Sequence, residues 1–534
     1  MKLLNKRFYI ISLALLALGT FSSCIDWGRR AGGSDKLSDL LYIIGNQYVD
    51  SVDMEDLIEK TIPKVLAELD PHSVYIPAQK AEESDQELRG SFSGVGIQFM
   101  IQSDTIYVSD VISGGPAEKV GLMPGDRIIT IDDSLYVGKS INNDGAMKRL
   151  KGPKGSEVTL GIKRQGEKGL LSFTIVRGNI PVKSIDASYL IDGRWCYIKA
   201  NKFGETTYPE MLVALAKGMQ QDMEGCIIDL RGNTGGYMMA AIQMVNEFLP
   251  KGEMIVYTEG ENVPRYEEYA NGRGTCQKLP LVVLTDETSA SASEIFAGAI
   301  QDNDRGTIIG RRTFGKGLVQ RPIEFADGSA IRLTIARYYT PSGRCIQKPY
   351  VNGHGDEYNL DLLNRYEHGE FFTQDSIKQD ESIAYQTKNG RVVYGGGGIM
   401  PDIFVPQDTA GYTSYYAAVA KMGLFTRFPF EYTDKNRATL VAYTTMDDLL
   451  SYLKQQNLLE QFVQHASSKG VKRRNNLISQ SRSVMEDILY GNVIYNMLGM
   501  EEYVKYLNLT DPAVLKAIEI LDSGTSRPQV EREE

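Results

Sequence analysis

A repeated strand–turn–helix pattern in the middle of the chain most constrains its fold. Cys226–Leu230 reads as a buried strand that ends in Arg231-Gly-Asn-Thr-Gly-Gly236 and continues into an apolar helical stretch, Tyr237–Phe248. Leu281–Thr285 repeats the scheme and leads through a serine-rich turn into the helical run Glu294–Ile300. Strands that alternate with helices favour an α/β core, in which functional groups gather where strands lead into helices.

The whole chain is too long for a single core. Its 534 residues suggest about three domains, and the expected fold class is multidomain α/β. The patterns predict a signal peptide at 1–23, a tether at 24–34, a helical segment at 35–87, a β-rich domain at 88–178, the α/β core at 180–406 with a polar, irregular insertion at about 346–395, a helical region at 407–521 and a disordered tail at 522–534.

Local signals support the regions outside the core. Apolar residues recur at helical spacing from Leu37 to Leu69, and Asp70-Pro-His-Ser73 follows as a turn. In the β-rich region, runs such as Arg127–Ile131 are separated by glycine-rich turns, with one helical stretch near Ala146–Leu150. Thr445-Met-Asp-Asp448 is a capping box ahead of an apolar helix in the C-terminal region.

The N-terminus predicts a lipoprotein signal. Lys2, Lys6 and Arg7 precede the apolar run Phe8–Leu18, which is too short for a stable membrane span. Phe21-Ser-Ser-Cys24 then resembles a bacterial lipobox, in which Cys24 becomes the acylated first residue. The alternative is an ordinary cleaved signal with an incidental cysteine. The first interpretation places the protein in the bacterial cell envelope, lipid-anchored and facing the periplasm.

Charge and cysteine usage exclude several function classes. The net charge is −10 and no long basic block is present, which argues against a nucleic-acid partner. The four further cysteines are too widely spaced for a disulfide framework or a metal-ligand pattern, and Cys226 in its apolar run reads as a buried thiol. We therefore expect neither a cofactor nor a metal.

One stretch supplies a nucleophile and a base without histidine. Ser289-Ala-Ser-Ala-Ser-Glu294 is followed, 25 residues after Ser291, by Lys316 between two glycines, and Gln320 lies four residues further on. A Ser-His-Asp hydrolase would need a histidine beside its serine. The chain has only four, none in these stretches: His72, His354, His368 and His465.

The chemistry of a serine–lysine pair sets requirements on its surroundings. A serine hydroxyl is a poor nucleophile until a base removes its proton. A lysine can do so once burial or neighbouring cations lower its pKa from about 10.4 toward neutrality, and Gln320 could hold the amine without adding a charge. For a nucleophile at Ser291, the N–H of Ala292 would stabilise the oxyanion, with a second N–H from the turn that holds Gly235 and Gly236.

Simpler readings exist for the same residues. Ser291 and Glu294 also fit S-x-x-E, an ordinary helix cap, and residue chemistry does not choose among Ser289, Ser291 and Ser293. The run from Gly310 to Lys316 imitates a nucleotide-binding P-loop. However, Gly317 replaces the Ser or Thr that would hold magnesium, and Leu318-Val-Gln-Arg-Pro322 looks extended rather than helical, so we reject the P-loop.

Two further stretches resemble bacterial PDZ domains. Gly114-Gly-Pro-Ala-Glu-Lys-Val-Gly-Leu-Met-Pro-Gly-Asp-Arg-Ile-Ile129 is similar to their central stretch, and Gly94-Val95-Gly96-Ile97 to their carboxylate-binding loop. Glycines let successive backbone N–H groups point at a terminal carboxylate, and the next strand edge then pairs with the peptide. A glycine pair before a strand could alternatively be only a tight turn.

Several motifs in order resemble the carboxyl-terminal processing, or tail-specific, serine proteases. They are Leu69–Ser73, the PDZ stretch, Asp229–Gly236, Ser289–Asp302, Thr313–Gln320, Tyr339–Arg344 and Gly398–Asp402. The resemblance implies a dyad of Ser291 and Lys316 with Gln320 as its orienting residue. It departs at Thr288, where many relatives have glycine.

The resemblance implies an endopeptidase whose PDZ domain captures a polypeptide with a free, apolar C-terminus. We further expect the protein to be attached to the membrane through its lipid anchor and to form a homo-oligomer. One alternative is a catalytically silent PDZ scaffold of the cell envelope, and another is an esterase or amidase that acts on a small envelope substrate.

Overall fold

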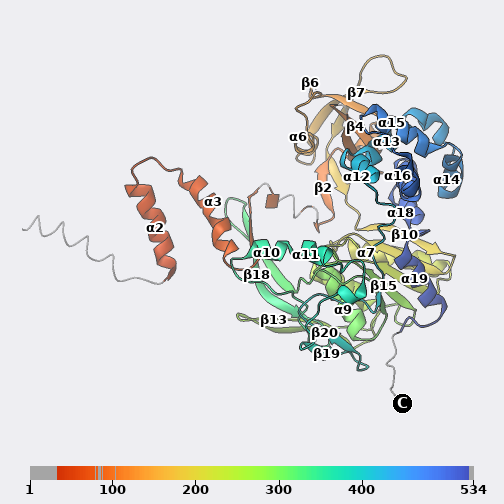
Figure 1. Cartoon of the computed structure of the whole chain (residues 1–534). Coiled ribbons are helices and arrows are strands. Elements are labelled where there is room, and N and C mark those ends of the chain that lie inside the picture. The colour runs from red at the N-terminus through yellow and green to blue at the C-terminus, as the bar shows by residue number, and fades with distance from the viewer. Residues whose placement is uncertain (1–32, 79, 82–85, 87, 103, 528–534) are drawn as a thin grey trace, which may run out of the picture. The chain divides into compact units, whose positions relative to one another are not determined.

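The computed structural model describes residues 33–527 apart from 79, 82–85, 87 and 103, and the chain divides into two compact units after Asp70 (Figure 1). The predicted signal peptide and Cys24 lie outside the described residues. The described residues of the first unit form the helices α2 (Gly33–Gln47) and α3 (Met54–Ala67). Asp53 caps α3 by accepting the N–H of Asp56 at 3.0 Å.

A β-rich domain forms the first part of the second unit. Its sheet has the order β3-β4-β5-β7-β8, with β6 beside β5: β3 (Ile97–Gln102), β4 (Thr105–Val111), β5 (Arg127–Ile131), β6 (Ser134–Leu135), β7 (Glu157–Lys163) and β8 (Leu171–Val176). Two helices, α5 (Pro116–Lys119) and α6 (Asn143–Leu150), complete it. The chain enters and leaves along an antiparallel pair, β2 (Ser91–Gly94) and β9 (Gly178–Pro181).

A six-stranded sheet forms the centre of the α/β core. In spatial order its strands are β10 (Ile185–Ile191), β11 (Trp195–Ala200), β12 (Gly225–Asp229), β15 (Leu281–Thr285), β16 (Thr307–Gly310) and β21 (Ile403–Phe404). All neighbours are parallel except β10 and β11. The predicted α/β fold class is thus confirmed.

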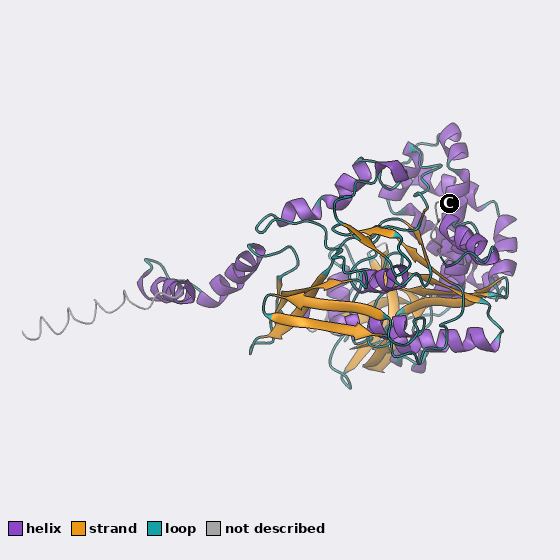
Figure 2. Ribbon diagram, turned by 90° about the horizontal axis from the view of Figure 1, so that it is seen from below, coloured by secondary structure: helices purple, strands orange, loops and turns teal. Residues whose placement is uncertain are grey.

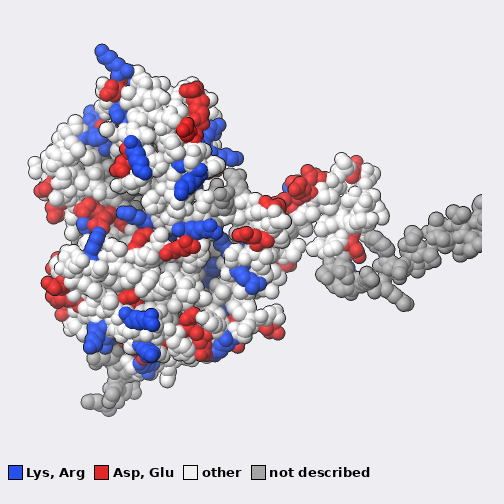
Figure 3. Space-filling view, turned by 180° about the vertical axis from the view of Figure 1, so that it is seen from behind, with Lys and Arg blue, Asp and Glu red and all other residues white. Residues whose placement is uncertain are grey.

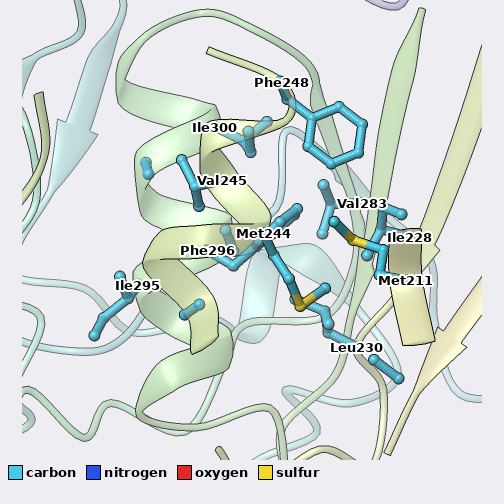
Figure 4. Packing of buried hydrophobic residues seen from close by; sticks show 14 of the residues in the cluster. Met211, Ile228, Leu230, Met244, Val245, Phe248, Val283, Ile295, Phe296 and Ile300 are labelled. Atoms are coloured by element: carbon cyan, nitrogen blue, oxygen red, sulfur yellow. The ribbon is translucent and has the colours of Figure 1, made fainter. Parts of the chain in front are cut away.

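Three helices cover one face of this sheet: α7 (Thr207–Gln220), α8 (Met238–Asn246) and α9 (Ala292–Asp302). Figure 4 shows Met211, Val245 and Phe296 from these helices packed near Ile228 and Val283 of the strands. Alternate strand residues point to the opposite face. The sheet is therefore apolar on both sides, as parallel sheets require.

A second sheet lies next to the lysine stretch in sequence. It joins β1 (Val74–Ile76), β18 (Ala330–Tyr339), β13 (Met254–Gly260) and β14 (Val263–Tyr269), with β17 (Leu318–Glu324) on the other side of β18. Lys316 is thus followed by a strand, as predicted, and not by the helix that a P-loop would need.

The segment 346–395 is more ordered than its polar composition suggests. It contains α10 (Gly355–Asn359), α11 (Asp361–Glu367), a single 3₁₀ turn (Gln374–Ser376) and the hairpin β19 (Ala384–Gln386) and β20 (Val392–Tyr394). Buried ion pairs hold it, since Glu370 pairs with both Arg312 and Arg365 at 2.6 and 2.8 Å. Charged residues give this segment a polar composition, but they can be buried because they form ion pairs.

The C-terminal region is helical throughout (Figure 2). Its helices are α12 (Ser414–Lys421), α13 (Leu424–Leu440), α14 (Met446–Lys454), α15 (Leu458–Ser468), α16 (Asn475–Gln480), α17 (Arg482–Leu498), α18 (Met500–Asn508) and α19 (Pro512–Asp522). Thr445 caps α14, as the sequence predicts. Helices α18 and α19 supply Val504, Val514, Ala517 and Leu521 to the apolar cluster on the second face of the central sheet.

The chain end differs from the prediction of a disordered tail from residue 522. Asp522 still belongs to α19, and Ser526 is buried, with its carbonyl accepting the Thr307 hydroxyl at 2.9 Å. Burial of the apolar face of α19 fixes this stretch, a tertiary effect that local charge does not reveal.

The surface agrees with the charge analysis. Lysines and arginines alternate with aspartates and glutamates over the face in Figure 3, and no continuous basic surface covers the described residues there. Among the described helices, none has both the length and the apolar character to cross a bilayer.

Candidate active site

The serine turn connects β15 to α9 and separates its three hydroxyls. Ser289 and Ser293 are fully buried, and their hydroxyls donate to the carbonyls of Leu230 and Asn233, each at 2.8 Å. Ser291 is only partly buried and has a φ of 56°, in the left-handed region that non-glycine residues seldom adopt. A strained serine on a strand-to-helix turn is typical of a nucleophile that is held up to its substrate.

Glu294 joins the serine turn to the lysine stretch. Its carboxylate accepts the backbone N–H groups of Ser291 at 2.8 Å, Gly315 at 2.7 Å and Lys316 at 2.8 Å. The Thr313 hydroxyl donates to the same carboxylate at 2.5 Å. Burial raises the pKa of Glu294 and these hydrogen bonds oppose the shift. Glu294 therefore accepts the backbone N–H of the helix-capping Ser291, as S-x-x-E predicts, and it also fixes the backbone of Lys316.

Tyr338 ties the same two backbones together from β18. Its buried hydroxyl donates to the carbonyl of Ser291 at 3.0 Å and also contacts the carbonyl of Lys316. Burial raises the pKa of Tyr338 well above its ordinary value, so the hydroxyl keeps its proton and remains a donor. The backbones of Ser291 and Lys316 are thus held by two shared side chains.

Gln320 holds the lysine amine, as the sequence predicts. Lys316 Nζ donates to Gln320 Oε1 at 2.8 Å. A register shift between Val319 and Gln320 interrupts the β17–β18 pairing, and such bulges re-aim side chains. Gln320 Nε2 in turn donates to the backbone carbonyl of His72.

Sequence reasoning missed the contribution of His72. The His72 carbonyl fixes the Gln320 amide so that its oxygen faces Lys316, while the imidazole Nε2 lies 2.8 Å from the hydroxyl of Tyr358. Strand β1, which follows at once, pairs with β18 on the side opposite β17 and brings this turn within reach of the Gln320 side chain. The resemblance of Leu69–Ser73 to the protease family was the only signal for it.

The glycine turn after β12 packs directly on the serine. A Cβ on Gly235 would lie 2.7 Å from the Cβ of Ser291, and one on Gly236 would lie 2.1 Å from the carbonyl oxygen of Phe203. Both glycines have positive φ, 104° and 142°. Only glycine allows this approach.

The three predicted oxyanion donors differ in availability. The N–H of Gly235 donates to Asn233 Oδ1 at 2.9 Å, so Gly235 is not a free donor, which corrects the prediction for that residue. The N–H groups of Ala292 and Gly236 have no hydrogen-bond acceptor among the described residues. These two are available for an oxyanion.

A buried charge cluster supports the glycine turn at its start. Asp229 pairs with Arg231 at 2.7 Å, and Tyr197 donates to Asp229 at 2.6 Å. Burial opposes ionisation of Asp229, but Arg231 and Lys199 outweigh it and hold its pKa well below the ordinary value. Arg231 also pairs with Asp511, just before α19, at 2.7 Å.

The segment after residue 345 supports the lysine stretch. The N–H of Gly317 donates to Gln347 Oε1 at 2.8 Å, and the N–H of Lys348 donates to the Gly315 carbonyl at 2.9 Å. Arg365 donates to the carbonyl of Thr313 at 3.1 Å. The polar segment thus fixes the backbone on both sides of Lys316.

The predicted carboxylate-binding loop lies between β2 and β3. The N–H groups of Val95 and Gly96 have no acceptor within the part of the chain that is described, and Ile97 begins β3. Gly96 has a φ of 83°, and a Cβ there would lie 3.0 Å from Ile180. The free N–H groups of Val95 and Gly96 therefore lie between Gly94 and the start of β3, which is an edge strand of its sheet.

Comparison with known proteins agrees with this arrangement. The sequence model of peptidase family S41 matches residues 194–354, that of the PDZ domain matches 84–163, and that of a family of unknown function matches 415–499. The chain is 36% identical to the carboxy-terminal processing protease CtpB of Bacillus subtilis over 60% of this chain and 67% of that one. It is 39% identical to a carboxy-terminal-processing protease of Bartonella bacilliformis over 58% of this chain and 72% of the relative.

A third relative is matched over most of its length. The carboxy-terminal processing protease CtpA of Bacillus subtilis is 32% identical over 73% of this chain and 87% of its own. The chain belongs to peptidase family S41. It carries a PDZ domain and is a serine protease, so the predicted enzyme class is confirmed.

Proposed function

We propose that the protein is an endopeptidase that uses Ser291 as nucleophile and Lys316 as general base. The observation that carries this proposal is the separation of the three serines. Ser289 and Ser293 have buried, bonded hydroxyls, whereas Ser291 occupies a strained turn tied to Lys316 through Glu294.

The reaction follows the chemistry of acyl transfer. Neutral Lys316 takes the Ser291 hydroxyl proton as Oγ attacks the scissile carbonyl carbon, and the N–H groups of Ala292 and Gly236 stabilise the oxyanion. The C–N bond then breaks, and the lysine ammonium returns the proton to the leaving amine. Water next attacks the acyl ester, giving its proton to Lys316, which protonates the departing Ser291 oxygen. Gln320 orients the amine throughout.

Substrate capture is assigned to the PDZ domain. A free C-terminal carboxylate would be held by the N–H groups of the Gly94–Ile97 loop, and the preceding residues would pair with the free edge of β3. An amidated C-terminus lacks the negative charge that this loop recognises. The substrate class is therefore polypeptides with free, apolar C-termini.

The decisive experiment uses the purified full chain and an unfolded protein with an apolar C-terminus, with products identified by mass spectrometry. Ser291→Ala and Lys316→Ala are each expected to lower kcat at least about 1,000-fold, with binding of a C-terminal peptide retained. Ser293→Ala is the matched control and should keep most of the activity. Full cleavage by Ser291→Ala would refute the dyad, and peptide binding without cleavage by the wild type would favour a silent scaffold.

The envelope location and assembly are part of the same proposal. Cys24 is the acylation site of a periplasm-facing lipoprotein, as the lipobox resemblance indicates. Metabolic labelling with a fatty acid should mark the wild type and not Cys24→Ser. A homo-oligomer through the helical regions is tested by sedimentation of the full chain.

A further inference from the structure

The C-terminal helical region contacts the PDZ domain through side chains on two of its helices. Figure 1 shows α13 beside β4. Asp434 of α13 pairs with Arg127 of β5 at 3.1 Å, and Tyr495 of α17 donates to Gln98 of β3 at 2.8 Å. Two further contacts are Gln102 Nε2 to Glu431 and an edge-to-face pair of Tyr107 and Phe430, with ring centroids 5.5 Å apart.

These contacts use the face of the PDZ sheet that points away from the domain's own core. Met100, Tyr107 and Arg127 are cross-strand neighbours in one row. The intervening side chains Phe99 and Ile101 pack against the PDZ core instead. Because side chains alternate along a strand, the helices cover the outer face only.

The contact surface leaves the proposed peptide site free. Within the described residues β3 pairs with β4 alone, so its other edge keeps unpaired backbone groups. Peptides that add a strand to a sheet bind such an edge. None of the four contacts uses a backbone group of β3 or the loop at Val95 and Gly96.

The same helical region is anchored to the protease core. Helix α18 follows α17 directly and contacts β10 of the core. Its Glu501 accepts the N–H of Ser188 at 3.2 Å, and its Asn508 donates to the Tyr189 hydroxyl at 2.7 Å. Asp511 then pairs with Arg231 at the start of the glycine turn. The helices therefore form a continuous connection between the PDZ sheet and the turn that holds Gly236.

We propose that the C-terminal helical region is an intramolecular docking platform for the PDZ domain. It fixes the PDZ domain to the protease core through the outer face of β3, β4 and β5 and leaves the peptide-binding edge open. The preference for a free substrate C-terminus then depends on this contact, although none of its residues touches the substrate. This inference rests on the proposed function of the PDZ domain.

A charge-swap cycle on the full chain tests the platform. Arg127→Glu and Asp434→Arg place like charges opposite each other when made singly, and the double variant restores an opposite pair. Each single variant should lower the ratio of kcat/KM for free over amidated substrate about fivefold or more, and the double variant should recover to within about twofold. Cleavage of the amidated substrate should not change.

Two further measurements separate docking from other effects. Hydrogen exchange in residues 424–440 should rise in the single variants and fall back in the double variant. Binding of a C-terminal peptide, measured in the Ser291→Ala background, should be unchanged in all of them. Lys154→Glu, an exposed charge reversal elsewhere in the PDZ domain, is the matched control.

The outcomes are distinct. Increased exchange with an unchanged substrate ratio would overturn the proposal, as would unchanged exchange in both single variants and in Phe430→Ala. If the wild type cleaves nothing or binds no peptide, the proposed function fails. The exchange cycle then still decides whether the helices dock the PDZ domain.

Discussion

Single residues at the site occupy conformations that their neighbours impose. The left-handed φ of Ser291 costs a non-glycine residue on the order of 1–3 kcal/mol, and the shared bonds of Glu294 and Tyr338 offset that cost. Gln320 is likewise fixed at both ends of its amide, by Lys316 and by the His72 carbonyl. The fixed Gln320 amide oxygen therefore accepts a hydrogen bond from the Lys316 amine without placing a negative charge beside it.

Gln320→Glu tests the value of that neutrality. A carboxylate at the same place favours the charged ammonium of Lys316 over the neutral amine that the proposed mechanism requires. The base then loses its proton only at higher pH, so the acid limb of the kcat/KM profile should move up by about one pH unit or more. Gln320→Met, which removes the acceptor without adding charge, should lower the rate without this upward shift. An unmoved profile in Gln320→Glu would contradict the role of Gln320.

At the scale of elements, the site is formed where three connections meet. They are the glycine turn after β12, the serine turn after β15 and the lysine stretch before β17. Parallel β12 and β15 are neighbours in the sheet, so the turns at their carboxyl ends lie together. The close packing of Gly235 on Ser291 follows from that adjacency.

Gly235→Ala should displace the serine turn. The new Cβ would lie 2.7 Å from Ser291 and 2.8 Å from the Ala290 carbonyl, too close for either to stay in place. A shift of about 1 Å can reduce kcat about 100-fold. Gly232→Ala in the same turn is the matched control. Gly232 also has a positive φ, 77°, but a Cβ added there would have no atom within 4 Å, so this variant tests backbone strain without the clash. Equal activity of the two variants would show that packing on Ser291 does not matter.

The whole molecule relies on its C-terminal end to complete the protease core. Helix α19 covers the second face of the central sheet, where Val514 and Leu521 meet Val282 and Ile309. Without it, a parallel sheet would expose an apolar face to water. The last helix is therefore a structural part of the core although it is more than 100 residues away from β21 in sequence.

Val514→Asp should lower the free energy of unfolding by several kcal/mol, because it buries an unpaired carboxylate in this cluster. Urea unfolding measured at pH 7 gives the size of the change. Leu515→Asp on the same helix is the control, since Leu515 is 48% exposed and should change stability by less than about 0.5 kcal/mol. Similar losses in both variants would mean that α19 does not pack as described.

The fold class and several strand positions could be predicted from the sequence alone, and the sequence also indicated candidate residues for the site. The runs Leu281–Thr285 and Arg127–Ile131 form strands as predicted, because apolar β-rich runs are a local signal. The resemblance to tail-specific proteases indicated Ser291, Lys316 and Gln320, whereas residue types alone left three serines equivalent.

Which groups are available, and what surrounds them, follows from the folded arrangement alone. It separates Ser291 from its buried neighbours, assigns the N–H of Gly235 to Asn233 and brings His72 to Gln320. It also places α19 on the central sheet and α13 on the PDZ domain. Each of these depends on contacts between residues distant in sequence, and such contacts leave no periodic or compositional trace in the segments that make them.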